Sequence, residues 1–499
     1  MKRLVDVASD VPREPVPRGS AREEAEFLDR LRSGVIGQGV AIRTPGGEKP
    51  LRYFDFIASG RFHRDVEDEL NERVLPFMAN THTESNATGR MMTEYYERSF
   101  ARIGRYLGAS PDDVLIPVGS GSTGVINRLI NILGLRVPDQ LEERHSLTRS
   151  IPAEERPVIF RSMMEHHSND IAWRETIGDN VYVAFDADGR VSLDDLDDQL
   201  GRFEGRPWKI GTFSAASNVT GILNDVPGLA RVLHRRGALA FFDYAAAGPY
   251  VDVAMHPAGD PDASADALFF SVHKFLGGPR TPGLLVANRK LFTNKVPIEP
   301  GGGTVLYTSP WNHRYLSSIA MRETGGTPPI VQSIQAGLAF DLKAAIGTER
   351  IFRIEQDFLA RALGEWEGKP GLYIMGNTKT RRLGVLSVIF RDLHHNLAAT
   401  LLNDLYGIQV RAGCMCAGPY GHLLLHIDED HSKEIRHRLD EGHLGEKPGW
   451  VRISFAPTVA EEEFQVLLEA VEHLRLHGKR YLDDYALRDD TGEWVRKTG

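Results

Sequence analysis

The chain has 499 residues, a formal net charge of −9, and 41% hydrophobic and 25% charged residues. This composition is typical of a globular protein, and it excludes a disordered chain, a collagen-like repeat and a nucleic-acid binder that relies on bulk positive charge. Because the length exceeds what one hydrophobic core usually serves, we expect two domains. The two cysteines, Cys414 and Cys416, are too few for a disulfide framework or a four-cysteine zinc site.

The N-terminal segment is rich in proline and charge, and no apolar stretch of signal-peptide length follows Met1. No run of about 18 uncharged apolar residues occurs elsewhere, so we predict no membrane span and a cytoplasmic location. Residues 1–50 are predicted to form an arm followed by a helix. Ser20, with an acidic residue three positions later, is a suitable cap for the start of that helix.

Residues 51–330 are predicted to form a large α/β domain. From about residue 110, short apolar runs alternate with helical stretches, and this alternation predicts a mainly parallel sheet with helices on both faces. The apolar runs cover residues 114–116, 158–160, 181–185, 210–213, 238–242 and 267–272.

The pattern changes after the Gly- and Pro-rich segment 325–329. Helical periodicity dominates residues 330–345, 350–367, 397–406 and 460–477, while 385–390 and 451–455 have the character of strands. We therefore predict a smaller α+β domain over 331–485, followed by a polar tail over 486–499.

Residues 119–124 (GSGSTG) stand between an apolar strand and a helix. Small residues let the backbone approach an anion, and the start of a helix offers free N–H groups. The segment is therefore either a phosphate cradle or an ordinary glycine-rich turn.

Lys274 follows an apolar strand and precedes a glycine-rich loop. Its amine is either a nucleophile activated by low dielectric or an ordinary lysine at a strand end. Asp243 ends the preceding strand. A lysine, a carboxylate and an anion cradle are what pyridoxal 5'-phosphate (PLP) needs for its covalent bond, its ring nitrogen and its phosphate, so the combination predicts a PLP-binding domain.

The segment 165–169 (EHHSN) carries adjacent histidines. Neighbouring side chains rarely converge on one metal ion, so we predict no metal site. An imidazole stacked on an aromatic cofactor and a solvated loop histidine are the two alternatives for His166.

Cys414 and Cys416 lie on a loop flanked by glycines, rather than in an apolar run. The nearby Arg411 would favour a thiolate. Residue types alone leave two readings of Cys416: a nucleophilic or sulfur-carrying thiol, and an inert one.

Over residues 50–475 the chain resembles the class V aminotransferase family, and most closely its cysteine desulfurase and selenocysteine lyase branch. The motifs that carry the resemblance, in chain order, are YFDFIAS (53–59), NTH (80–82), GST (121–123), EHHSN (165–169), SN (217–218), SVHK (271–274), GTP (326–328), RAGCMCA (411–417) and VRIS (451–454). The resemblance implies PLP-dependent transferase fold type I, with a mainly parallel seven-stranded sheet wrapped by helices.

The resemblance also implies roles for individual residues. Lys274 would bond covalently to PLP, His166 would stack on its ring and Asp243 would pair with its ring nitrogen. The cofactor-binding residues would be Ser122, Thr123, His166, Asn218, Asp243, Ser271, His273, Lys274 and Thr327. Thr327 would reach the phosphate across a dimer interface, which implies a homodimer.

On the substrate side, the resemblance implies that Arg452 holds the α-carboxylate, a role that suits its fork of donors, and that His82 also binds substrate. Lys274, Cys416 and His166 would be the catalytic residues. Four departures from the family pattern stand out: Ala246 in place of Gln or His, Gly124 in place of Glu, Cys414 and Met415 in place of two histidines, and an extra segment over 431–448.

The leading interpretation is a PLP enzyme that acts on a small L-amino acid, with cysteine as the substrate. Lys274 would take the Cα proton, and Cys416 would attack the substrate sulfur, with release of alanine and transfer of sulfur to a protein or small-molecule acceptor. The alternatives are a C–S lyase, aminotransferase or epimerase that does not use Cys416, and a binding protein that has lost catalysis.

Overall fold

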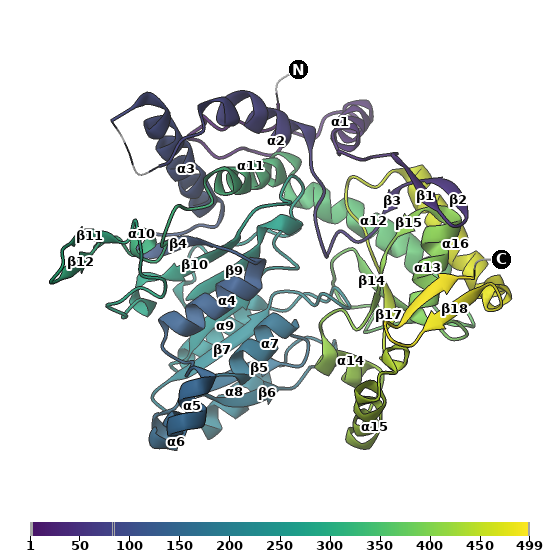
Figure 1. Ribbon diagram of the computed structural model, residues 1–499. Coiled ribbons are helices and arrows are strands. Elements are labelled where there is room, and N and C mark those ends of the chain that lie inside the picture. The colour runs from purple at the N-terminus through teal and green to yellow at the C-terminus, as the bar shows by residue number, and fades with distance from the viewer. Residues whose placement is uncertain (1–2, 82, 84, 498–499) are drawn as a thin grey trace. The chain divides into compact units, whose positions relative to one another are not determined.

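The computed structural model describes residues 3–81, 83 and 85–497 (Figure 1). The chain divides into two units that interleave along the sequence. Unit 1 comprises Met1–Val16, Gly60–Ala215 and Asn224–Thr348, and unit 2 comprises Pro17–Ser59, Ala216–Leu223 and Glu349–Gly499.

A seven-stranded sheet forms the centre of unit 1 (Figure 1). Its strands, in spatial order, are β4 (Asp113–Val118), β10 (Gly283–Asn288), β9 (Ala267–Ser271), β8 (Leu239–Asp243), β7 (Lys209–Ser214), β5 (Val158–Ser162) and β6 (Asp179–Val183). Strand β10 runs in the direction opposite to the other six strands of this sheet, so the carboxyl ends of those six meet at one edge. The predicted mainly parallel seven-stranded sheet is confirmed.

Helices cover this sheet because their apolar faces need burial. Side chains of α4 (Gly121–Ile132) and α7 (His167–Arg174) share one apolar core with the strands. The other α-helices of unit 1 are α2 (Arg64–Glu69), α3 (Ala87–Tyr106), α5 (Asp139–His145), α6 (Leu147–Ser150), α8 (Leu193–Arg202), α9 (Val226–Arg235), α10 (Ile319–Arg322) and α11 (Ile330–Ile346). Short helical turns occur at η1 (Leu70–Val74), η2 (Leu75–Phe77), η3 (Ala153–Glu155), η4 (Pro261–Ala263), η5 (Val272–Lys274) and η6 (Arg289–Leu291), and β11 (Val305–Thr308) pairs with β12 (His313–Tyr315).

The contacts within the chain divide it at other places than the boundaries predicted after residues 50 and 330. The first of these boundaries falls inside unit 2 and the second inside unit 1. Helix α11 packs against α3 in unit 1, where a Cβ on Gly337 would lie 2.8 Å from the Cβ of Ser99. The N-terminal arm also lies on unit 1, because Arg102 Nη1 donates to the carbonyls of Asp6 at 2.9 Å and Ser9 at 2.6 Å. Helix α1 (Ala21–Ser33) belongs to unit 2 and has the expected capping box at Ser20.

Unit 2 is an α+β structure built on an antiparallel sheet of β13 (Leu372–Ile374), β14 (Val385–Phe390), β17 (Trp450–Ser454) and β16 (Arg411–Gly413). Its remaining helices are α12 (Thr348–Trp366), α13 (His395–Tyr406), α14 (Gly418–Leu424), α15 (Glu429–Asp440), α16 (Glu461–His477), η7 (Leu444–Glu446) and η8 (Gly478–Tyr481). The short strands are β1 (Ala41–Thr44) with β2 (Gly47–Pro50), β3 (Arg52–Tyr53) with β15 (Ile408–Gln409), and β18 (Tyr485–Arg488) with β19 (Glu493–Arg496). Apolar residues of α12, α13, α16 and the sheet form its core. Among the described residues, no helix combines the length and apolar character needed to cross a membrane.

Candidate active site

The turn between β4 and α4 forms a cradle at the carboxyl edge of the sheet. Ser120 and Gly121 adopt positive φ values of 65° and 59°, and a Cβ on Gly121 would lie 3.0 Å from Ser271 Oγ and 2.9 Å from His273 Cε1. The backbone N–H of Ser122 donates to Ser271 Oγ at 2.9 Å. A side chain at residue 121 would therefore fill the space between the start of α4 and the end of β9, which is where a helix N-terminus can bind an anion.

Lys274 and Asp243 lie at the ends of neighbouring strands and interact electrostatically. Asp243 is 3% exposed and accepts a hydrogen bond from the Ala245 N–H at 2.8 Å. Burial raises the pKa of Asp243, while the Ala245 N–H, the positive charge of Lys274 and Ser122 oppose that rise. Burial and the charge of Lys274 lower the pKa of His273 to about 4, so its imidazole is neutral at pH 7.

His166 caps α7 beside the cradle. Its Nδ1 accepts the Ser168 N–H at 3.1 Å and lies 3.0 Å from Ser168 Oγ. The same hydroxyl lies 2.6 Å from Thr123 Oγ1, so the first turns of α4 and α7 are joined by a hydrogen bond. The structure therefore brings Thr123 and His166 together through Ser168, which sequence analysis did not single out.

Glu165 anchors the segment that leads into His166. Its carboxyl is fully buried and accepts hydrogen bonds from Ser162 Oγ at 2.6 Å, Ser214 Oγ at 2.6 Å and Asn169 Nδ2 at 2.7 Å. Burial raises the pKa of Glu165 to about 7, although these three donors oppose the rise. Sequence analysis assigned Glu165 no role, since nothing in the sequence shows that its donors come from two different strands and a helix.

A second group of site residues lies in unit 2 and centres on Arg452. This arginine, on β17, is 3% exposed. Its Nη1 donates to the carbonyl of Asn218 at 3.1 Å, and its Nη2 donates to Asp55 Oδ1 at 2.9 Å. Asn218 is itself buried, and its Nδ2 donates to the carbonyl of Met415 at 2.8 Å. The structure thus joins Asn218 and Arg452 with the residue that precedes Cys416.

Cys416 is exposed and lies on the loop between β16 and α14, while Cys414 is half-buried. Met415 and Cys416 adopt positive φ values of 56° and 55°, which non-glycine residues rarely adopt. Most of the extra segment 431–448 forms α15 and η7, and the side chains of α15 are exposed or half-buried. Asp55 was missed in sequence analysis, because it follows a two-residue strand and has no periodic signal.

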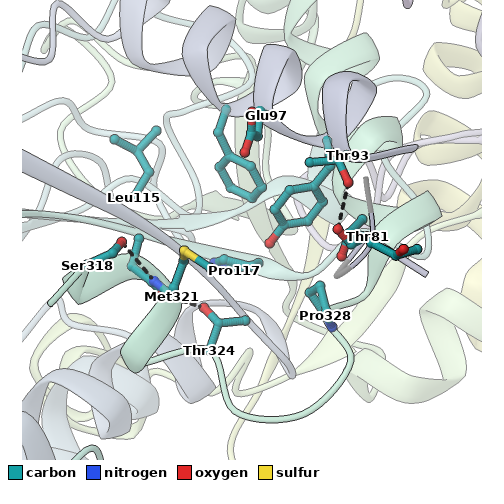
Figure 2. Close-up of a pocket in the computed structure, with 13 residues that line it drawn as sticks. Thr81, Thr93, Glu97, Leu115, Pro117, Ser318, Met321, Thr324 and Pro328 are labelled. Carbon is teal, nitrogen blue, oxygen red and sulfur yellow. Dashed lines mark hydrogen bonds between the residues drawn. The ribbon is translucent and has the colours of Figure 1, made fainter. Parts of the chain in front are cut away.

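One cavity of unit 1 is lined by neighbours of the remaining predicted residues. Thr327 is exposed in the loop before α11, and its neighbour Pro328 lines a cavity of about 630 Å³ (Figure 2). His82 lies outside the described residues, and the flanking Thr81 and Thr83 line the same cavity. Tyr96 from α3 contributes to its walls together with polar and apolar side chains. In the described part of the chain, no three histidine, cysteine, aspartate or glutamate residues form a cluster that could hold a metal ion.

The model of the "Aminotransferase class-V" family matches residues 52–467. The chain belongs to this family. Its members depend on PLP.

Among curated relatives, a protein of Halalkalibacterium halodurans named "Probable cysteine desulfurase" is 28% identical over 378 residues, covering 74% of this chain and 85% of the relative. A Staphylococcus aureus protein with the same name is 28% identical over 375 residues, covering 74% of this chain and 84% of the relative. The fold matches a cysteine desulfurase from Thermococcus onnurineus (TM-score 0.68, 24% identity, 85% of this chain and 95% of that one). It also matches the cysteine desulfurase CsdA from Escherichia coli (TM-score 0.66, 21% identity, 90% and 97%).

The residues of this class V chain fit PLP. The glycine turn at residue 121 leaves room that a Cβ would fill, and the adjacent Ser122, Ser271 and neutral His273 supply donors for a phosphate. Asp243 is a buried carboxyl suited to a ring-nitrogen cation, and Lys274 stands close enough to affect its pKa.

Proposed function

We propose that this class V enzyme is a cysteine desulfurase-like enzyme that takes sulfur from L-cysteine onto Cys416 and releases alanine. The observation that carries the proposal is the exposed Cys416 on a loop tied, through Met415 and Asn218, to the buried Arg452. The names of the relatives, each described as a probable cysteine desulfurase, support the same substrate.

In this proposal Lys274, Asp243, His166, Asn218 and the Ser122–Ser271 cradle hold PLP, which when bound supplies an electron sink for negative charge at the substrate Cα. The Nζ of Lys274 acts as the general base that takes the proton from the substrate Cα. Arg452 orients the substrate by binding its α-carboxylate.

Cys416 carries the sulfur transfer. Its sulfur attacks the sulfur of the substrate, so that an S–S bond forms and the substrate C–S bond breaks. The proton of the Cys416 thiol is balanced by the proton gained at the substrate Cβ, and the Nζ of Lys274 returns its proton to Cα, which leaves alanine and a persulfide. A protein or small-molecule thiol then removes the outer sulfur. A cytoplasmic location, where thiols remain reduced, belongs to the same proposal.

Product analysis tests this proposal. We expect wild-type holoenzyme and Cys414→Ala to release alanine from L-cysteine, and Cys416→Ala to release none. Absence of alanine from the wild type would refute the proposal. Pyruvate and sulfide formed by both wild type and Cys416→Ala would identify a C–S lyase of the same family, and turnover of another amino acid by Cys416→Ala would indicate an aminotransferase or epimerase.

The proposal includes a homodimer, and exposed apolar residues of unit 1 support it. On the β11–β12 hairpin, Trp311 is 89% exposed and Leu306 is 62% exposed. The segment that leads into this hairpin contacts the Thr327 loop, because the Gly326 N–H donates to the carbonyl of Gly302 at 2.8 Å. Exposed apolar patches of this kind mark association sites.

Sedimentation analysis tests the dimer. We expect a dimer for the wild type and a weakened dimer for the double variant Leu306→Asp, Trp311→Asp. The matched variant Val495→Asp alters an exposed apolar residue of unit 2 and should leave the dimer intact. A monomeric wild type would refute this part of the proposal.

A further inference from the structure

A ring of polar contacts in unit 2 connects Arg452 to the loop that carries Cys416. Asp55 lies in this ring: its Oδ1 accepts from Arg452 Nη2 at 2.9 Å, and its Oδ2 accepts from Arg411 Nε at 3.2 Å. Arg411 is the first residue of β16, the strand that leads directly into the cysteine loop. One carboxylate therefore bridges Arg452 and the start of that loop.

Asn218 closes the ring on the other side. Its carbonyl accepts from Arg452 Nη1 at 3.1 Å, and its side-chain Nδ2 donates to the carbonyl of Met415 at 2.8 Å. The cysteine loop is thus held at two points, Arg411 before Cys414 and Met415 after it. Both points are connected to the same guanidinium.

Backbone pairing of β16 with β17 holds the start of the loop, and these side-chain contacts add to it. Met415 and Cys416 are both in the left-handed region, which costs a non-glycine residue conformational energy and persists only where the surroundings impose it. The hydroxyl of Tyr420, in the helix that follows, lies 3.4 Å from that of Thr220, so the contact there is long. The bond from Asn218 is shorter and acts on the loop itself, and the bond from Asp55 acts on Arg411 in the strand that leads into the loop.

The two halves of the Asp55 bridge differ in strength. The side chains of Arg452 and Asp55 are 4% and 13% exposed, so their charge-assisted bond lies in a region of low dielectric. The side chain of Arg411 is 51% exposed, so solvent screens its bond to the same carboxylate. An added negative charge beside Arg452 therefore acts strongly on Asp55. Of the two bonds that Asp55 makes, the weaker one to Arg411 is the one expected to break.

We propose that Asp55 is a positioning residue that couples the occupancy of Arg452 by a small carboxylate to the mobility of the loop bearing Cys416. This inference rests on the proposed role of Arg452 in binding the substrate carboxylate. An incoming carboxylate brings a second negative charge to a guanidinium that Asp55 already contacts. The two anions repel, Asp55 loses part of its hold on the two arginines, and the cysteine loop is released when a carboxylate is present.

Alkylation of Cys416 by iodoacetamide in the holoenzyme measures this release. A Cys414→Ser background leaves Cys416 as the one thiol of the chain. Propionate serves as the probe, because it has a carboxylate and no amine that could react with the cofactor. We expect saturating propionate to raise the alkylation rate at least threefold. Measurement over a range of pH, from about 6 to 10, separates a change in access from a change in thiolate fraction.

In the same background, Asp55→Asn should be alkylated at the raised rate without propionate, and propionate should add nothing further. Arg411→Gln provides a second variant that is safe for folding, because this side chain is half exposed, and it should behave in the same way. The matched control Glu461→Gln removes an ion pair with Arg361 on α12 and should retain the wild-type response to propionate.

The coupling is overturned if propionate leaves the alkylation rate of the background protein unchanged, or if Asp55→Asn and Arg411→Gln keep its full response. These results are distinct from failure of the proposed function. A response to propionate without release of alanine from cysteine would retain the coupling and refute the desulfurase activity. Release of alanine without any response to propionate would refute the coupling alone.

Discussion

The buried carboxyl of Glu165 gives a prediction about stability that follows directly from its environment. The change Glu165→Gln keeps the shape of the neutral carboxyl and removes its ionisation. The amide can still accept from Ser214 and Asn169, and it can donate to Ser162, whose hydroxyl is free to rotate. We therefore expect the variant to fold and to differ from wild type mainly in the pH dependence of its free energy of unfolding.

The magnitude follows from the pKa. Burial raises the pKa of Glu165 from 4.5 to about 7. Between these values the folded protein holds more protons than the unfolded chain, so the free energy of unfolding falls as pH rises. The full effect is about 3 kcal/mol well above pH 7, and most of it develops between pH 5 and 8. The free energy of unfolding of Glu165→Gln should not fall in this way, because the amide does not ionise.

Urea-induced unfolding at several pH values between about 5 and 8 measures the effect as the difference between variant and wild type, in which the other titrating groups cancel. We expect the variant to gain about 2 to 3 kcal/mol relative to wild type over this range. The exposed Glu204→Gln in the same unit should show no such trend. A difference that stays constant with pH, or that moves against the variant, would show that the three donors keep Glu165 ionised.

Three further changes have defined outcomes. Burial raises the pKa of Glu355 to about 8, so Glu355→Gln should gain stability relative to wild type as pH rises through 6 to 8, measured by urea unfolding, and an unchanged difference would contradict this. Gly121→Ala should weaken PLP binding at least tenfold in a fluorescence titration, because its Cβ would lie 3.0 Å from Ser271 Oγ, whereas Gly119→Ala meets no atom within 4 Å and should bind normally. Ser20→Ala should cost about 1 kcal/mol in thermal unfolding through loss of the α1 cap, and a loss below a few tenths would argue against the cap.

The sheet of unit 1 was largely predictable, because buried parallel strands are continuous apolar runs separated by helices. Residues 158–160 and 210–213 fall within β5 and β7. Strand β10 (Gly283–Asn288) was not predicted, although it is apolar. It runs antiparallel and follows β9 without an intervening α-helix, so the alternation of strand and helix that marks the other strands is missing there.

The division of the chain into units depends on contacts that no local pattern contains. Helix α11 follows the Gly- and Pro-rich segment 325–329, where the sequence pattern changes, yet its residues are buried almost all round and pack against α3. Conversely, α1 is close in sequence to the arm of unit 1 but contacts unit 2, where Arg350 on α12 binds Glu24 at 3.0 Å. Periodicity predicts a helix and its apolar face, but it does not identify the surface that the face covers.

Local sequence patterns also fail to identify contacts between distant segments of the site. Some site residues could therefore be predicted to lie together, and others could not. Asp243 and Lys274 end neighbouring strands, and the carboxyl ends of parallel strands meet at one edge, so their proximity follows from the fold class. The contacts of Asp55 with Arg411 and Arg452 join segments from opposite ends of the chain. No spacing rule relates such residues, and only the folded unit reveals that one carboxylate serves two arginines.

The two groups of site residues differ in their charges: unit 1 presents a buried carboxyl, and unit 2 presents an arginine that is paired with a carboxylate. This difference fits the ligand group that each would bind. In unit 1, burial raises the pKa of Asp243, and the positive charge of Lys274 opposes this rise. A buried carboxyl in that state is stabilised by a second cation, and the protonated ring nitrogen of PLP is a cation of the right kind. In unit 2, Arg452 already has a carboxylate partner in Asp55. Under the proposed role of Arg452, a substrate carboxylate would compete with Asp55 for this guanidinium, and Asp55 also contacts Arg411 at the start of the strand before Cys416.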